Sequence, residues 1–239
     1  CLRLSSEAPV PIFKLLRTET QQGMVLNVEK NLRAFEMSVE TISNDFGLIT
    51  KERFIDNRTG QHLLRLDTGE NSSLPPLNLD NINIDNYDCV AISDYDKGSL
   101  PYEKCEKISK LCFEKNKKLF VDSKKTNLGC FEGAVIKINE EERRRIQQFP
   151  TNYDLVVTLG SEGACWNETI FSACKAEVFD VCGAGDTFFA ALISEFLKTD
   201  SMKASVVFAN GCASIAVQKN GCYSLNPKEI KEVRNDLCS

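Results

Sequence analysis

The second half of the chain alternates between short apolar runs and segments with helical spacing. Four apolar runs each end in polar residues or glycine: residues 88–93, 118–122, 134–138 and 154–159. These runs are continuous rather than alternating in polarity, which is typical of parallel strands buried on both faces. Residues 101–116 have helical spacing, with a proline near the start. The pattern predicts an α/β core built around a mostly parallel sheet.

The first 70 residues have a different pattern. Four short runs with strand composition are separated by polar turns: residues 9–13, 39–42, 48–54 and 62–66. Residues 25–34 have the spacing of a helix. We interpret residues 1–70 as a small β lid interleaved with an early helix of the main domain, and residues 71–239 as the α/β core. The polar, proline-containing segment 69–76 is the expected linker.

A glycine turn leads into the most regular helical segment of the chain. Residues 183–186 read G-A-G-D and are followed directly by a run with helical periodicity. The first amides of a helix have no internal partners and carry the positive end of the helix dipole, so they form a site for an anion. Asp186 at this position has two interpretations: a cap of the helix, or a base beside a bound phosphate.

Composition narrows the function classes. The 239 residues carry a net charge of −5, with 29 basic and 34 acidic side chains. This balance gives no support to binding of nucleic acid or of a membrane surface, so a small molecule is the expected partner. No apolar run reaches the roughly 18 residues that a membrane span needs, and the start does not resemble a signal peptide. We therefore expect a cytoplasmic protein.

Eleven cysteines accompany a single histidine, but no two cysteines have the C-x-x-C spacing of a metal site. Most stand alone in apolar or helical contexts, where cysteine behaves as a small core residue. Cys182 differs because it lies beside the glycine turn, where a helix N-terminus lowers the pKa of a thiol. Its alternative interpretation is a tolerated small residue.

Eight motifs, in order along the chain, resemble those of the ribokinase or PfkB family of sugar kinases, and most closely its heptose-7-phosphate kinases. They lie at residues 4–11, 64–67, 93–98, 121–124, 139–142, 158–163, 180–186 and 208–211. The resemblance implies a three-layer α/β/α sandwich with a mostly parallel central sheet and a small β lid.

The resemblance also implies roles for the residues of phosphoryl transfer. Asp186 corresponds to the catalytic base, and Gly183, Ala184 and Gly185 correspond to the anion hole for the transferred phosphate. Asn139 and Glu142 match the N-x-x-E motif, which holds Mg²⁺ largely through water. From the residues alone, an ordinary acidic helix start is the favoured explanation of that motif.

ATP is the implied cosubstrate, and five residues match nucleotide-binding positions of the family: Lys124, Thr158, Gly160, Gly163 and Asn210. A plain turn between two strands also explains the two glycines, and a lysine at this place is often a surface residue. Four residues match the acceptor side: Gly23, Asn27, Asp94 and Lys97. The family usually has a Gly-Gly pair before the asparagine, whereas this chain has Gln22-Gly23.

Two hypotheses follow. The first is an active ATP- and Mg²⁺-dependent kinase that phosphorylates a sugar or sugar phosphate, with a homodimer formed through the lid. The second is a nucleotide-binding family member with a structural or regulatory role. The chain begins at Cys1 and lacks the family's first strand, which we interpret as either a fragment or a reduced member.

Overall fold

A six-stranded mixed sheet forms the centre of the molecule. The computed structural model describes residues 3–44, 47, 49–69, 73–80 and 82–237. The strands have the order β10-β9-β8-β7-β6-β5, and β5 to β8 are parallel while β9 and β10 alternate in direction. Their bounds are β5 Cys89–Asp94, β6 Lys118–Ser123, β7 Val135–Asn139, β8 Asp154–Thr158, β9 Ala164–Trp166 and β10 Thr169–Phe171. The predicted parallel core is therefore confirmed.

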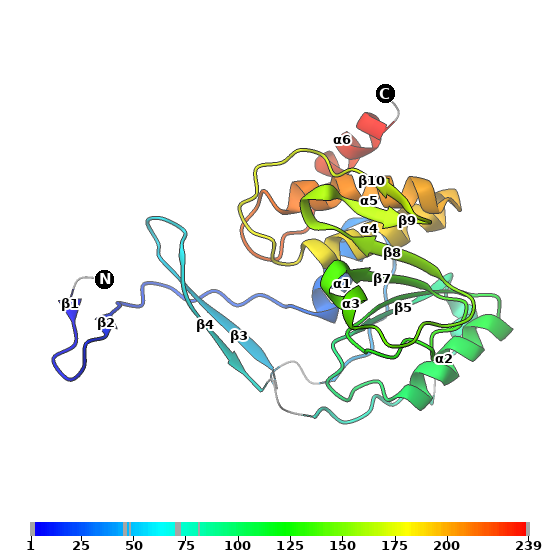
Figure 1. Cartoon of the computed structure of the whole chain (residues 1–239), viewed down its shortest axis with the longest axis horizontal. Helices are drawn as coiled ribbons and strands as arrows, with labels where there is room; N and C mark the ends of the chain where they lie inside the picture. Colours follow the sequence, from blue (N-terminus) through cyan, green and yellow to red (C-terminus); the bar gives the residue numbers. More distant parts are fainter. Residues whose placement is uncertain (1–2, 45–46, 48, 70–72, 81, 238–239) are drawn as a thin grey trace.

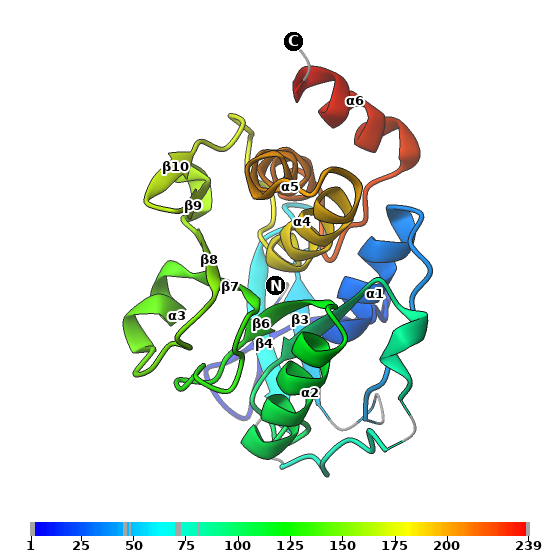
Figure 2. The same cartoon turned by 90° about the vertical axis from the view of Figure 1, so that its right-hand side faces the viewer.

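Helices cover both faces of this sheet, as Figure 2 shows with α4 and α5 on one side and α2 on the other. The helices are α1 Val25–Ala34, α2 Tyr102–Glu114, α3 Glu140–Arg145, α4 Ala184–Thr199, α5 Met202–Ala216 and α6 Pro227–Leu237, with short 3₁₀ turns at Ile84–Asn86 and Gly160–Glu162. Within the described part of the chain, none of the helices combines the length and the apolar character that crossing a bilayer requires. The arrangement is the expected three-layer α/β/α sandwich.

Strand β6 shows why the apolar runs are continuous. Phe120 is fully buried against the layer of α4 and α5, where its ring meets that of Phe196 edge to face at 5.5 Å. Its neighbours Leu119 and Val121 point to the other face and join the cluster beneath α2. Because both faces are covered, the positions between Lys118 at the start of the strand and Asp122 at its carboxyl edge are all apolar.

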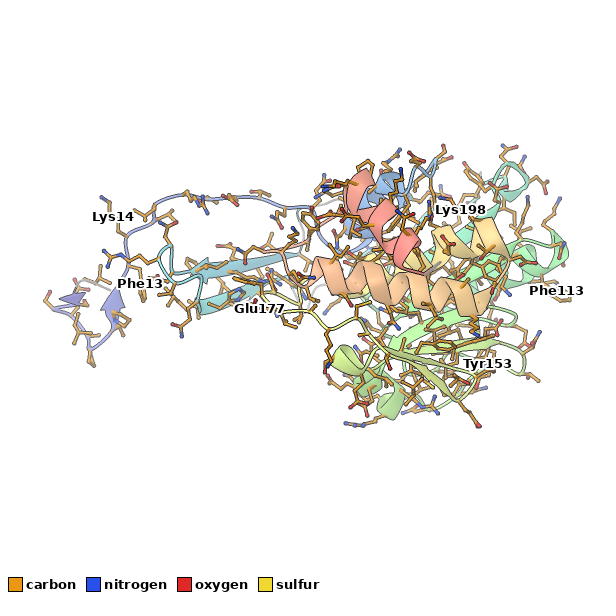
Figure 3. All side chains as sticks on the ribbon, turned by 90° about the horizontal axis from the view of Figure 1, so that it is seen from above. Phe13, Lys14, Phe113, Tyr153, Glu177 and Lys198 are labelled. Carbon is orange, nitrogen blue, oxygen red and sulfur yellow. The ribbon has the colours of Figure 1, made fainter. Side chains whose placement is uncertain are left out.

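An arm projects from the core and carries the lid strands (Figure 1). It contains the pairs β1 Arg3–Leu4 with β2 Pro11–Ile12, and β3 Thr50–Ile55 with β4 His62–Thr68. Every residue of β3 and β4 is exposed. Figure 3 shows Phe13 and Lys14 on this arm and Phe113 and Tyr153 at the opposite end of the molecule. Helix α1, although it lies between the arm strands in sequence, packs in the core against α4.

One predicted strand of this region is wrong. Residues 39–42 form no strand; instead Val39 packs against the core beneath α1, and its carbonyl accepts a hydrogen bond of 2.7 Å from Arg33. A short segment that has no neighbouring strand to pair with can bury its apolar side chains against a helix instead, and its sequence pattern does not separate the two outcomes. Residues 70–72 of the expected linker, and residue 48 of a predicted strand, lie outside the described residues.

Candidate active site

The entrance to α4 is a glycine turn that only glycine fits. Gly183 has φ of 75°, in the left-handed region, and acts as the N-cap of the helix. A Cβ at this position would lie 2.8 Å from Asn27 Nδ2 and 3.2 Å from Cys222 Cα. Ala184, Gly185 and Asp186 then form the first turn, and Thr187 N closes it on the Gly183 carbonyl at 2.9 Å. Ala184 N donates to the Val181 carbonyl at 3.3 Å, so the amides of Gly185 and Asp186 are the ones that face no acceptor in the turn and suit an anion.

Asp186 is a half-buried carboxylate whose orientation is fixed by a hydrogen bond. Asn27 Nδ2 donates to Asp186 Oδ2 at 2.7 Å. Asn27 is in turn fully buried, and Asn31 Nδ2 donates to its backbone carbonyl at 2.8 Å. Burial raises the pKa of Asp186, the charge of Asp122 adds to the effect, and the hydrogen bond from Asn27 opposes it. A carboxylate with a raised pKa is a stronger base than an exposed one, as a general base requires.

A row of two lysines and two acids lies beside this carboxylate, at the carboxyl edge of β6 and β7. Lys137 Nζ and Asp122 Oδ2 are 2.6 Å apart, Lys124 Nζ lies 3.4 Å from Asp122 Oδ1, and Lys124 also pairs with Glu142. Burial acts to raise the pKa of Asp122, but the two lysines outweigh it and hold that pKa low. Lys124 is likewise held protonated: burial opposes its charge, and the two acids raise its pKa.

Lys137 approaches the glycine turn itself. A Cβ built on Gly185 would lie 3.2 Å from Lys137 Nζ, so glycine leaves room for the ammonium next to the first amides of α4. Two sources of positive character therefore meet at one place, a side chain from β7 and a helix N-terminus. An ammonium group beside helix amides is an arrangement that attracts an anion.

The predicted metal-binding pair forms a helix cap. Asn139 Oδ1 accepts from Glu142 N at 2.8 Å, and Glu142 Oε2 accepts from Asn139 N at 2.9 Å, which is a complete capping box at the start of α3. The other Glu142 oxygen accepts from Lys124. Since both carboxylate oxygens already have partners, these residues suit contact with Mg²⁺ through water better than direct coordination.

Three of the predicted nucleotide-binding residues lie along the edge formed by β8, β9 and β10, and a fourth reaches this edge from α5, whereas Lys124 lies after β6 in the row of lysines and acids. Gly163 has φ of 103°, and a Cβ there would meet the Phe171 carbonyl oxygen at 2.1 Å. Asn210 of α5 is buried and donates to that same carbonyl at 2.7 Å. Thr158 ends β8, and Gly160 opens the 3₁₀ turn with nothing near its Cβ position. Asn210 therefore fixes the end of β10 that packs against Gly163.

On the acceptor side, an open groove runs from Asp186 and Gly183 to the arm, and Gly23 and Lys97 are among its lining residues. Asp94 reaches the groove but its carboxylate is engaged elsewhere. Its Oδ2 accepts from Ser123 Oγ at 3.0 Å and lies 3.3 Å from Lys125 Nζ, and its Oδ1 accepts from Asp96 N at 2.9 Å. In this structure Asp94 therefore fixes the loop after β5.

The sequence matches one protein family over residues 50–229, about three quarters of the chain, and that family is described as pfkB family carbohydrate kinase. The chain belongs to the pfkB family. It is accordingly an enzyme of the carbohydrate kinase type, as its motifs indicate.

Two pfkB relatives and one solved structure illustrate the similarity. The bifunctional protein HldE of Nitratiruptor sp. is 30% identical over 285 residues, which cover 99% of this chain and 62% of that protein. HldE of Sulfurimonas denitrificans is 26% identical, covering 99% and 61%. The chain thus spans less than two thirds of the length of these relatives. Ribokinase of Arabidopsis thaliana, solved with ribose and ATP, has a TM-score of 0.58 at 20% identity and covers 73% of this chain and 65% of its own, which shows a ribokinase-like fold.

Three residues of this pfkB site were missed by the sequence analysis. Lys137 interrupts the apolar strand V-I-K-I-N, and a lysine inside a buried strand is a signal that it has a charged partner. That partner is Asp122, the residue after the apolar run of β6. Tyr95 lies under Lys124, with 5.7 Å between Nζ and the ring centroid, and burial together with the charge of Asp186 raises its pKa. Nothing in the local sequence around Tyr95 distinguishes it from a surface tyrosine.

Proposed function

We propose that this chain transfers the γ-phosphate of ATP to a hydroxyl of a sugar or a sugar phosphate. One observation carries the proposal: Asp186, a half-buried carboxylate with a raised pKa, lies at the entrance to α4 and faces the open groove. A base for an attacking hydroxyl and donors for a phosphate are therefore present at one place, which is what phosphoryl transfer needs.

In the proposed reaction Asp186 Oδ1 accepts the proton of the acceptor hydroxyl, while Asn27 holds Oδ2. The amides of Gly185 and Asp186 donate to oxygens of the transferred phosphate, and Lys137 adds positive charge beside them. These donors are fixed by the backbone of α4 and by the ion pair with Asp122, so they need no rearrangement as charge develops. Removal of one such donor typically costs about 10²–10³ in turnover.

ATP and Mg²⁺ are proposed as cosubstrate and cofactor. The space kept open by Gly183 and Gly185, between α4 and Lys137, supports a phosphate site. The edge formed by Thr158, Gly160 and Gly163 supports the nucleotide end, and the related fold of Arabidopsis ribokinase was solved with ATP. Magnesium, when bound, offsets the charge of phosphate oxygens, and Asn139 and Glu142 would meet it through water.

For the acceptor we propose a sugar phosphate of the kind that the resemblance of the sequence motifs to heptose-7-phosphate kinases implies, a heptose phosphate. Gly23 and Lys97 line the groove on this side, and a lysine there suits an acceptor that carries its own phosphate. Asn27, predicted as an acceptor residue, acts in this scheme by orienting the base.

We further propose that residues 1–70 serve as a lid over the acceptor and that two chains pair through it. Strands β3 and β4 expose apolar side chains, with Leu64 60% and Leu66 49% accessible. An isolated two-stranded hairpin has marginal stability in water. A second surface that covers β3 and β4 would explain why they carry apolar side chains.

The test is ADP release over a panel of sugars and sugar phosphates, including heptose 7-phosphate, for the wild-type chain and the Asp186→Asn variant. We expect turnover with at least one acceptor and its loss in the variant. If ATP stabilises the protein but no acceptor exceeds the variant, the chain is a nucleotide-binding member without kinase activity, and the proposal fails. Thermal stabilisation by ATP, measured separately, tests the nucleotide site alone.

A further inference from the structure

Two half-buried cysteines lie side by side at the entrance to α4. The Sγ atoms of Cys182 and Cys222 are 3.5 Å apart, although 40 positions separate them in sequence. Cys182 immediately precedes Gly183, and a Cβ on Gly183 would lie 3.3 Å from Cys222 Sγ. The pair therefore touches the turn that binds the transferred phosphate in the proposed reaction.

Asp180 holds the two segments that carry these cysteines. Its Oδ1 accepts from Cys182 N at 2.9 Å, and its Oδ2 accepts from Gly221 N at 2.9 Å. Cys222 N also donates to Gln21 Oε1 at 3.1 Å. Because backbone amides on both sides are fixed, the proximity of the sulfurs is a property of the fold.

The two thiols differ in acidity. The hydrogen bond from Cys222 lowers the pKa of Cys182 to about 6, with a further contribution from Arg53 and against desolvation and the charges of Asp180 and Asp186. The same contact and burial raise the pKa of Cys222. Cys182 is therefore the more acidic thiol of the pair, and this order suits Cys182 as the attacking thiol and Cys222 as the resolving thiol.

We propose that Cys182 and Cys222 form a site of reversible oxidation by hydrogen peroxide, which closes to a disulfide. The Cys182 sulfur attacks the peroxide: an S–O bond forms, the O–O bond breaks, and the leaving hydroxide takes a proton to become water. The Cys222 sulfur then attacks the sulfenic sulfur: the S–S bond forms, the S–O bond breaks, and a second water leaves with the Cys222 proton. Both sulfurs are oxidised and the peroxide is reduced. A dithiol reverses the change by thiol–disulfide exchange and is itself oxidised.

Closing the bond has a consequence for the turn. The sulfurs must approach from 3.5 Å to about 2.05 Å, so the two segments share a movement of about 1.5 Å next to Gly183. Misplacement by about 1 Å costs about a hundredfold in turnover at a catalytic site. This effect rests on the proposed function, whereas the oxidation itself does not.

Peptide mapping tests the oxidation. Trypsin leaves Cys182 as the only cysteine in residues 176–198 and Cys222 as the only one in residues 220–228. After peroxide and then alkylation of free thiols, we expect these two peptides linked, while the buried pair Cys105 and Cys130 stays alkylatable after unfolding. Alkylation of Cys182 and Cys222 to the same extent as the exposed Cys174 would overturn the proposal.

Two further measurements sharpen the test. In the Cys222→Ser variant, oxidation of Cys182 should stop at the sulfenic acid, which a 1,3-dione traps. If Cys182 of the variant still forms a disulfide, Cys222 is not the resolving thiol. Peroxide should lower the turnover of the wild-type chain by about a hundredfold, and dithiothreitol should restore it. The Cys222→Ser variant cannot form the disulfide, so its turnover should not show this hundredfold fall and recovery. A linked protein with full turnover would leave the oxidation standing and refute its effect on the turn.

Discussion

The carboxyl edge of the sheet and the β3–β4 arm hold ion pairs of the same length in opposite surroundings. Lys137 and Asp122 are 2.6 Å apart with side chains 5% and 9% exposed. Arg65 and Asp67 are also 2.6 Å apart, but their side chains are 49% and 28% exposed. In the arm, water competes for both partners, so the ion pair contributes little to the free energy of unfolding. At the edge, loss of either partner would leave a buried charge without its main partner. The burial of an ion pair therefore tells more about its role than the distance between its atoms does.

The largest effect is expected at Asp186, where burial serves the reaction and opposes stability. Asp186→Asn should lower turnover by about 10²–10⁴-fold, the usual contribution of a general base. Because the pKa of Asp186 is raised in the folded state, its contribution to stability is full below the ordinary value of 3.8 and is lost as the pH rises through the folded pKa. The variant should therefore be the more stable protein at neutral pH, with the difference vanishing at acid pH. Thermal unfolding across pH measures this; a variant that is less stable at pH 7 would contradict it.

Lys137→Met tests the buried pair directly. It leaves Asp122 buried without its main partner, and we expect a loss of about 3–5 kcal/mol in the free energy of unfolding. Arg65→Met is the matched control, because it removes a pair of the same length in the arm and should leave the unfolding midpoint nearly unchanged. Urea titration of both variants gives the comparison. Equal losses would show that burial does not separate the two pairs.

Substitution of a glycine with positive φ is expected to cost more at the sheet edge than in the arm. Gly163→Ala places a Cβ 2.1 Å from the Phe171 carbonyl oxygen at a φ of 103°, and we expect a cost of about 1–3 kcal/mol. Gly60→Ala in the arm has a φ of 71° but no atom within 4 Å of its Cβ, so only the local strain remains. Chemical unfolding of the two variants should rank Gly163→Ala as the more damaging; the reverse order would mean that the β9 edge adjusts freely.

The smallest effect on stability is expected from Leu64→Ser in the arm. Leu64 is 60% exposed, so the free energy of unfolding of a single chain should change by less than about 0.5 kcal/mol. If chains pair through the lid, the variant should shift the mass in sedimentation towards the monomer. Phe113→Ser, at the opposite end of the molecule and 77% exposed, is the control that should leave the mass unchanged (Figure 3). A monomeric wild type would remove the pairing from the proposal.

The sequence predicted the elements whose signal is local. The apolar runs of β5 to β8 and the helix at residues 25–34 appear where the pattern indicates, because burial on two faces or along one stripe leaves its own periodicity. The role of Asp94 could not be predicted in the same way, since Ser123 and Lys125 come from another strand end and only the fold brings them to its carboxylate. The same applies to Cys182 and Cys222, whose contact spans 40 positions.

The reversal of direction at β9 determines how the chain reaches its own catalytic turn. Thr158, Ala164 and Phe171 stand in one row across β8, β9 and β10, so two successive hairpins return the chain to the edge from which it left. A further parallel strand would have needed a crossover of a dozen or more residues. The chain would then have passed over a face of the sheet before it reached the carboxyl edge again. Here, a connection of about a dozen residues leads directly from β10 to Gly183. The turn at residues 159–163 and the glycine turn at residues 183–186 are thus joined by two short hairpin strands and one connection, so a change in one has a short covalent route to the other.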